Sequence, residues 1–141
     1  MSTAEEIRDN LSRAYPEDSF QVIHANNYCI SSFSGDLLFN LQSNESYVLV
    51  LKMRVSPGPA ITDEKLFQIA FRWVFETIHV PDIDARRDFI KKKLVADFPQ
   101  YNVLVLAFKA SHAWFAPAAR AKASAVFRGA YGDHDFVVVL F

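Results

Sequence analysis

The residues best suited to acid–base chemistry are the histidines, and the sequence contains four of them. His134 lies between Asp133 and Asp135, and carboxylates beside an imidazole can orient a general base or help to bind a metal. A polar turn that leads into a strand explains the same three residues. The sequence contains no glycine-rich phosphate loop, His-Glu-x-x-His, Gly-x-Ser-x-Gly or Cys-x-x-Cys motif. It therefore favours a non-enzymatic protein, and we predict neither a cofactor nor a metal site.

A basic cluster lies on a predicted helix over residues 83–97. Its members are Arg86, Arg87, Lys91, Lys92 and Lys93. Such a cluster can bind phosphate, nucleic acid or an acidic protein partner, or it can be a solvated helix face with ion pairs to Asp88. Arg87 differs from the others because its helical angle falls inside the apolar stripe. We expect it to reach out along its stem or to pair with a buried acid.

Aromatic residues mark a second candidate binding site, between residues 111 and 117. His112 and Trp114 follow an apolar strand and precede a predicted helix, where they could line a pocket at the end of the strand. The same aromatic residues could instead close the end of the sheet as core. Tryptophan is enriched in binding hot spots, so both residues remain candidates for partner binding.

The elements that must position these residues follow from hydrophobic periodicity. Helices are predicted over residues 3–15, 63–79, 83–97 and 117–128. Strands are predicted over residues 20–25, 28–33, 37–42, 47–55, 102–109 and 135–141. The helix over 63–79 is apolar around most of its circumference, which is typical of a buried central helix. The helix over 117–128 is predicted from Pro117 in its first turn and Gly129 just past its end.

The order α-β-β-β-β-α-α-β-α-β predicts a single α+β domain over residues 1–141. Short connections favour an N-terminal antiparallel meander, and a strand–helix–strand unit follows at the C-terminal side. We expect the last two strands to run parallel through a right-handed crossover. The predicted fold is a mixed sheet of about six strands, packed by about four helices.

An alternative function comes from a resemblance in topology over residues 1–109. An acidic residue, Asp36, follows the second predicted strand, and Lys52 lies in a long predicted strand. The position two residues before Lys52 holds Val50, whose side chain cannot bind a metal. This order resembles the core of the PD-(D/E)xK nuclease-like fold. The resemblance implies a nuclease-like or phosphate-ligand-binding domain with a degenerate metal site. Its catalytic set would be Asp36, Glu45 and Lys52, with Glu45 folding in from the preceding turn.

Composition limits the remaining function classes. Of the 141 residues 51% are hydrophobic and the net charge is −1, which excludes a disordered chain and gives no global case for nucleic acid or membrane. The only cysteine, Cys29, leaves no disulfide within the chain. No apolar run approaches the ~20 residues that span a bilayer. The first residues also lack the features of a signal peptide. We expect a cytoplasmic protein, or one in the host cytosol if the source is viral.

These observations favour a non-enzymatic protein-binding domain of the inhibitor, immunity-type, adaptor or chaperone-like kind. Residues 1–60 contain four Lys or Arg and seven Asp or Glu, so this half of the chain is acidic. The expected surface includes the basic helix 83–97, because a basic face beside an acidic half provides electrostatic complementarity for another protein. Nucleic acid is the alternative partner. The aromatic excess and the terminal apolar strand also permit a homo-oligomer.

Overall fold

The computed structural model describes residues 3–26, 31–33, 36–42, 46–109, 113–116, 120–128 and 132–141. The helices are α1 (Thr3–Ala14), α2 (Asp63–Glu76) and α3 (Ile83–Asp97). The strands are β1 (Ser19–Asn26), β2 (Ser31–Phe33), β3 (Asp36–Gln42), β4 (Ser46–Met53), β5 (Val103–Phe108), β6 (Ala113–Ala116), β7 (Ala123–Phe127) and β8 (Asp135–Leu140). The prediction of α3 is confirmed at both ends, and α1 ends one residue earlier than predicted.

Side-chain caps explain where α2 and α3 begin. The hydroxyl of Thr62 accepts a hydrogen bond from the amide of Lys65 at 3.1 Å. The carboxylate of Asp82 accepts from the amides of Asp84 and Ala85 at 2.8 and 3.2 Å. Each cap satisfies amides that lack a partner within the first turn. Within the described residues, no helix combines the length and hydrophobicity required to cross a membrane.

The strands form two four-stranded sheets rather than one. The first sheet has the order β3-β4-β1-β6, and the second has the order β2-β5-β8-β7. Every pairing in both sheets is antiparallel. The prediction of a mixed sheet of about six strands is therefore wrong. So is the continuous meander, because β2 pairs with β5 and β1 pairs with β4.

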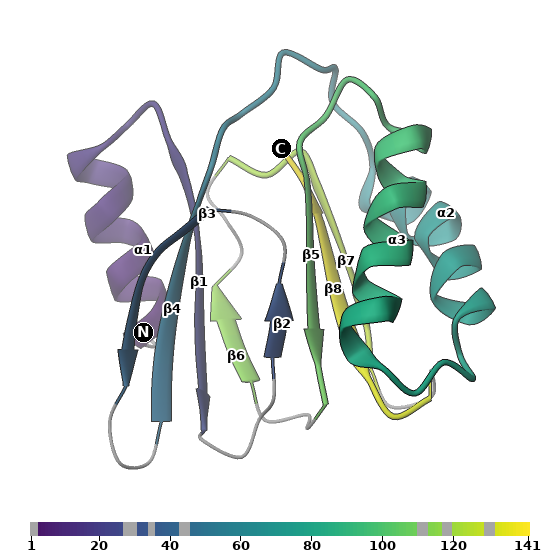
Figure 1. Ribbon diagram of the computed structural model, residues 1–141. Coiled ribbons are helices and arrows are strands. Elements are labelled where there is room, and N and C mark those ends of the chain that lie inside the picture. The colour runs from purple at the N-terminus through teal and green to yellow at the C-terminus, as the bar shows by residue number, and fades with distance from the viewer. Residues whose placement is uncertain are drawn as a thin grey trace.

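The elements stack in four layers, with α1 outside the first sheet and with α2 and α3 outside the second (Figure 1). The layer between the sheets is apolar on both sides. It joins Leu49 and Leu51 of β4 to Leu104 and Leu106 of β5 and to Val137 of β8. Burying this layer supplies most of the driving force that holds the two sheets together.

Alternation along the strands assigns neighbouring residues to different layers. In β5, Leu104 packs between the sheets whereas Val105 packs under α2 and α3. In β4, Val50 packs under α1 whereas Leu51 packs between the sheets. Strands covered on both faces must be apolar at every position. This requirement explains the continuous apolar runs of β5 and β8 and confirms that the start of the strand predicted over 47–55 is covered on both sides.

The segment predicted as a fourth helix over 117–128 contains a strand instead, and its first three residues lie outside the described ones. Residues 123–127 are β7, which pairs antiparallel with β8 along its whole length. Ala123, Ala125 and Phe127 face the helical layer, and the small residues allow α2 to approach closely. Tertiary pairing therefore overrides the helix propensity of the alanines. The strands predicted over 102–109 and 135–141 are β5 and β8, and they pair antiparallel, so the predicted parallel crossover is also wrong.

Candidate functional site

The largest apolar feature on the surface of α2 is a row of three phenylalanines. Phe67, Phe71 and Phe75 are 37%, 39% and 56% exposed. Their spacing of four residues places them on one face of the helix. The rings stack in sequence, with centroids 6.3 Å apart for Phe67–Phe71 and 5.9 Å apart for Phe71–Phe75. We call these three residues the aromatic ladder.

The aromatic ladder corrects the prediction that α2 is a buried central helix. Only the stripe of Leu66, Ala70 and Val74 is fully buried, against the second sheet. The helix lies in an outer layer, so it has a sheet on one side and α3 on another. Three of its apolar residues remain exposed beyond these contacts. An exposed row of large apolar side chains is a feature of interaction sites in soluble proteins.

The ladder is anchored to the body of the protein at one end. Phe67 stacks on Phe127 of β7 with 4.6 Å between ring centroids and 14° between ring planes. Phe127 is fully buried in the core under α2. The ladder is therefore a continuation of the core onto the surface, and its first ring, Phe67, is held in place before any partner binds.

The basic cluster does not form one continuous face. Arg86 is fully buried. Arg87 pairs with the carboxylates of Asp84 and Asp88 at 3.3 and 2.8 Å. Of the two alternatives expected for Arg87, pairing with a buried acid is wrong, because both carboxylates are well exposed. The side chain instead reaches out to these two surface carboxylates.

The three lysines of the cluster have different surroundings. The amine of Lys93 lies 5.2 Å from the Trp73 ring centroid and 5.4 Å from that of Phe89, as in cation–π contacts. Lys92 is exposed, whereas Lys91 lines a pocket. Among the five residues of the basic cluster, only Lys91 and Lys92 lie at the surface without a described ion pair or aromatic contact.

Arg86 joins the end of α2 to α3 and to the loop before β8. Its Nε donates to the hydroxyl of Thr77 at 3.1 Å, and its Nη2 donates to the carbonyl of Val74 at 3.0 Å. Its guanidinium carbon lies 4.6 Å from the ring centroid of Phe136. A cation at a helix C-terminus satisfies terminal carbonyls and interacts favourably with the helix dipole. The role of Arg86 is structural, and the prediction that it binds a partner does not fit its burial.

His134 completes this buried centre. Its Nδ1 lies 3.1 Å from Nη1 of Arg86. Because a guanidinium only donates, Nδ1 must accept and the ring proton must lie on Nε2. Burial, and next the Arg86 cation, lower the pKa of His134 below its usual value. The imidazole is therefore neutral and faces an arginine, which differs from a general base oriented by carboxylates.

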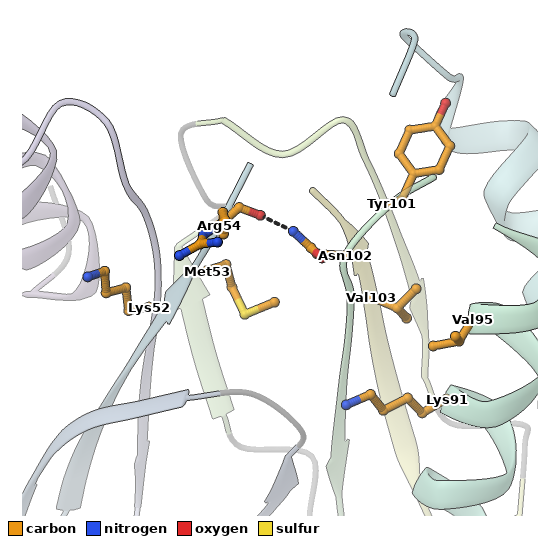
Figure 2. Close-up of a pocket in the computed structure, with 8 residues that line it drawn as sticks. All are labelled: Lys52, Met53, Arg54, Lys91, Val95, Tyr101, Asn102 and Val103. Carbon is orange, nitrogen blue, oxygen red and sulfur yellow. Dashed lines mark hydrogen bonds between the residues drawn. The ribbon is translucent and has the colours of Figure 1, made fainter. Parts of the chain in front are cut away.

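A pocket of about 360 Å³ opens between β4, β5 and α3 (Figure 2). Its lining residues are Lys52, Met53, Arg54, Lys91, Val95, Tyr101, Asn102 and Val103. The amine of Lys91 points from α3 toward the strands, whereas the amine of Lys52 points the opposite way, toward α1 (Figure 2). The structure thus places one residue from each of the two function hypotheses, Lys52 and Lys91, around one pocket.

The proposed nuclease-like set is only partly described. Asp36 lies opposite Lys52 in the β3–β4 pairing. The amine of Lys52 lies 3.5 Å from the carboxylate of Asp18, which is a partner the sequence did not suggest. Glu45 lies outside the described residues, and its neighbour Ser46 begins β4 about 20 Å from Lys52 by strand rise. Among the described residues, no three His, Cys, Asp or Glu side chains are grouped as ligands for a metal ion.

The remaining candidates lie largely outside the described residues. His112 and Cys29 are outside them, and only the backbone of Trp114 is described, in β6 opposite His24. Sequence reasoning missed the aromatic ladder as a surface, and it missed Arg54 and Asn102 as pocket residues. The four-residue spacing of the ladder was visible in the sequence, but spacing alone does not separate a surface stripe from a core stripe.

Comparisons with protein-family models, with curated proteins and with solved structures gave no match. Inferences about function therefore depend on the geometry of the described residues.

Proposed function

We propose that this protein is a non-enzymatic protein-binding domain whose partner docks on the aromatic ladder of α2. The observation that carries this proposal is the exposure of Phe67, Phe71 and Phe75 in one stacked row. The proposal covers inhibitor, immunity-type, adaptor and chaperone-like proteins, because each of these acts by binding another protein. Aromatic residues are enriched at the centres of such interfaces.

The energetics of the ladder favour binding. Each phenylalanine that a partner covers gains roughly 25 cal/mol for every Å² of apolar surface removed from water. The stack onto Phe127 holds the first ring in place, so little side-chain freedom is lost on binding. A preorganised apolar row of this kind has the properties of an interface hot spot.

The shape of the ladder indicates the kind of partner. From Phe67 to Phe75 the row spans eight residues, which is about 12 Å along the helix axis. The apolar stripe of an amphipathic partner helix has a matching length over two turns. The polar flank of α2, with Gln68, Arg72 and Glu76 exposed, would form the rim of the interface.

The experiment is an affinity capture from the source lysate with three forms of the protein: wild type, Phe71→Asp and Gln100→Asp. Both substitutions introduce the same charge at exposed positions, but Gln100 follows α3 and belongs neither to the ladder nor to its polar rim. We expect one stoichiometric protein to bind wild type and Gln100→Asp and to be lost with Phe71→Asp. A partner that remains bound to Phe71→Asp would place the interface elsewhere.

Light scattering of the purified protein tests the self-association that the sequence permits. If the partner is a second copy of this chain, the wild type is a dimer and Phe71→Asp dissociates it. A monomeric wild type at micromolar concentration would exclude a tight homodimer on this face.

A further inference from the structure

Strand β7 lies at the edge of the second sheet. It pairs with β8 along its whole length, and no described strand lies on its other side. The amide of Ser124 points to that open side, because it donates to the carboxylate of Asp63 at 3.0 Å. Residues of an antiparallel strand alternate between facing the partner strand and facing away from it. The N–H and C=O of Val126 therefore also point to the open side.

Asp63 closes only the beginning of this edge. Its carboxylate satisfies the amide of Ser124. Within the described part of the chain, the N–H and C=O of Val126 have no partner on the open side, and the side chain of Val126 is 38% exposed. A strand edge with unpaired main-chain groups is a template for an added strand. We call the open side of residues 124–127 the β7 edge.

Both faces of the sheet beside the β7 edge are apolar. On the helical side, Phe127 stacks on Phe67 with 4.6 Å between ring centroids. Val126 is exposed on the opposite face, because alternation along the strand separates it from Ala125 and Phe127. A strand added here would meet apolar surface on both of its faces, so its central residues should be apolar at consecutive positions.

Basic residues flank this apolar stretch. Arg120 and Lys122 precede β7, and Arg128 follows it. Among the described residues, no carboxylate lies within ion-pair distance of Arg120 or Lys122. A segment with acidic residues on either side of an apolar centre complements these charges, and such complementarity selects one partner over another.

A second copy of this chain does not fit the β7 edge. Helix α2 packs on β7, so two copies joined through β7 would hold their α2 helices one strand spacing apart, which is roughly 4.8 Å. Packed helices need about 8–10 Å between their axes. An antiparallel pairing centred on Ala125 would also bring Lys122 of one copy opposite Arg128 of the other, where like charges repel. The occupant must therefore be a different protein.

We propose that the β7 edge binds an extended segment of another protein, apolar at its centre and acidic at its ends, as a further strand of the second sheet. Main-chain hydrogen bonds to Val126 and to the C=O of Ser124 supply affinity, and the side chains of the segment supply specificity. This inference goes beyond the helix proposed for the aromatic ladder, and either site can exist without the other.

The experiment selects ligands from random peptides displayed on phage and then measures the affinities of the selected peptides in synthetic form. The protein variants are Val126→Pro and, as the matched control, Val126→Thr. Proline removes the outward N–H and leaves the pairing with β8, which is why proline is tolerated in edge strands. Threonine keeps the N–H and the branched shape that suits a strand. Melting temperatures establish whether each variant is folded.

We expect the selected peptides to carry consecutive apolar residues between acidic ones. Their affinity should fall about tenfold or more in Val126→Pro, because a carbonyl of the bound peptide loses its donor, and it should be kept in Val126→Thr. Lys122→Glu should weaken binding because it repels the acidic flank of the peptide. Phe71→Asp should still bind the peptides, so the proposals for the β7 edge and for the ladder can fail separately.

A second measurement uses only wild-type protein and decides the question if Val126→Pro does not fold. Alternate amides of an extended peptide face opposite edges, so each set can be N-methylated in turn. Methylation of the set that faces β7 should abolish binding, whereas methylation of the other set should leave it unchanged.

Four outcomes would overturn the proposal. The first is that no peptide is selected. The second is that the selected peptides bind folded Val126→Pro as tightly as wild type, or are lost in Phe71→Asp instead, which would assign them to the ladder. The third is an equal effect of methylating either set of amides. The fourth is a wild-type dimer that Val126→Pro dissociates, which would identify the occupant as a second copy.

Discussion

At the scale of single residues, the buried centre around Arg86 shows what sequence could and could not predict. The helical pattern placed Arg87, rather than Arg86, inside the apolar stripe of α3, and this assignment is wrong. The buried residue is Arg86, because Val74, Thr77 and His134 supply its hydrogen-bond acceptors. These partners lie 12, 9 and 48 residues away along the chain. Periodicity within one helix contains no information about them.

Replacing Arg86 should strongly destabilise the fold. Arg86→Met leaves the carbonyl of Val74 and the ring of His134 without their donor in a buried site, so we expect a loss of about 3 kcal/mol or more in the free energy of unfolding. The control is Arg87→Met, whose ion pairs to Asp84 and Asp88 are on the surface and should be worth about 1 kcal/mol or less. Urea denaturation measures both. Equal stability of the two variants would contradict the capping role of Arg86.

The position of His134 predicts a loss of stability in mild acid. Burial and Arg86 lower its pKa in the folded state, so below the unfolded value of about 6.5 the unfolded chain binds a proton that the folded chain resists. The free energy of unfolding should therefore fall as pH drops, by up to about 1.4 kcal/mol per pH unit, until the folded pKa is reached.

Urea midpoints measured from about pH 7.5 to about pH 5, which brackets the unfolded pKa, report this effect. His134→Gln keeps an acceptor for Arg86 but cannot titrate, so its stability should fall less steeply over the same window. His79→Gln removes an exposed imidazole and should keep the wild-type slope. Parallel slopes in wild type and His134→Gln would exclude His134 as the source.

At the scale of elements, α2 and β7 show two reasons why local pattern fails. The residues of α2 are apolar on two faces, and composition does not distinguish the face that meets the sheet from the face that remains exposed. In β7, local helix propensity disagrees with the pairing that β8 imposes. Helix α1 was predictable because its apolar residues recur at helical spacing and Pro16 follows its end. Helix α3 was predictable because Ile90 and Leu94 lie at helical spacing and Asp82 caps its first turn.

The two faces of α2 should respond differently to truncation. Val74 is fully buried, so Val74→Ala removes core contacts and should cost about 2 kcal/mol. Phe75 is 56% exposed, so Phe75→Ser should cost less than about 1 kcal/mol although it removes far more atoms. Thermal and urea unfolding measure both changes. A larger loss for Phe75→Ser than for Val74→Ala would assign the ladder to the core and remove the basis for docking on it.

At the scale of the whole molecule, the α+β class was predictable because the helical and strand periods are distinct along the chain. The division into two sheets was not predictable, because the residue pattern of an apolar strand is the same whichever sheet the strand joins. Strand β2 illustrates this point: it follows β1 directly in the chain and yet pairs with β5 in the other sheet. The sheet that a strand joins depends on the apolar layer between the sheets, to which both sheets contribute residues from distant parts of the sequence.

That shared layer predicts that both sheets unfold together. The two tryptophans are Trp73, on the helical layer of the second sheet, and Trp114, in β6 of the first sheet. In Trp114→Phe and in Trp73→Phe the remaining tryptophan reports on one side only, while circular dichroism reports on the whole molecule. Because neither sheet can lose its inner face without exposing the other, we expect the fluorescence and dichroism midpoints to coincide within each variant. Separate midpoints would mean that the sheets are independent units and that the layer between them contributes little to stability.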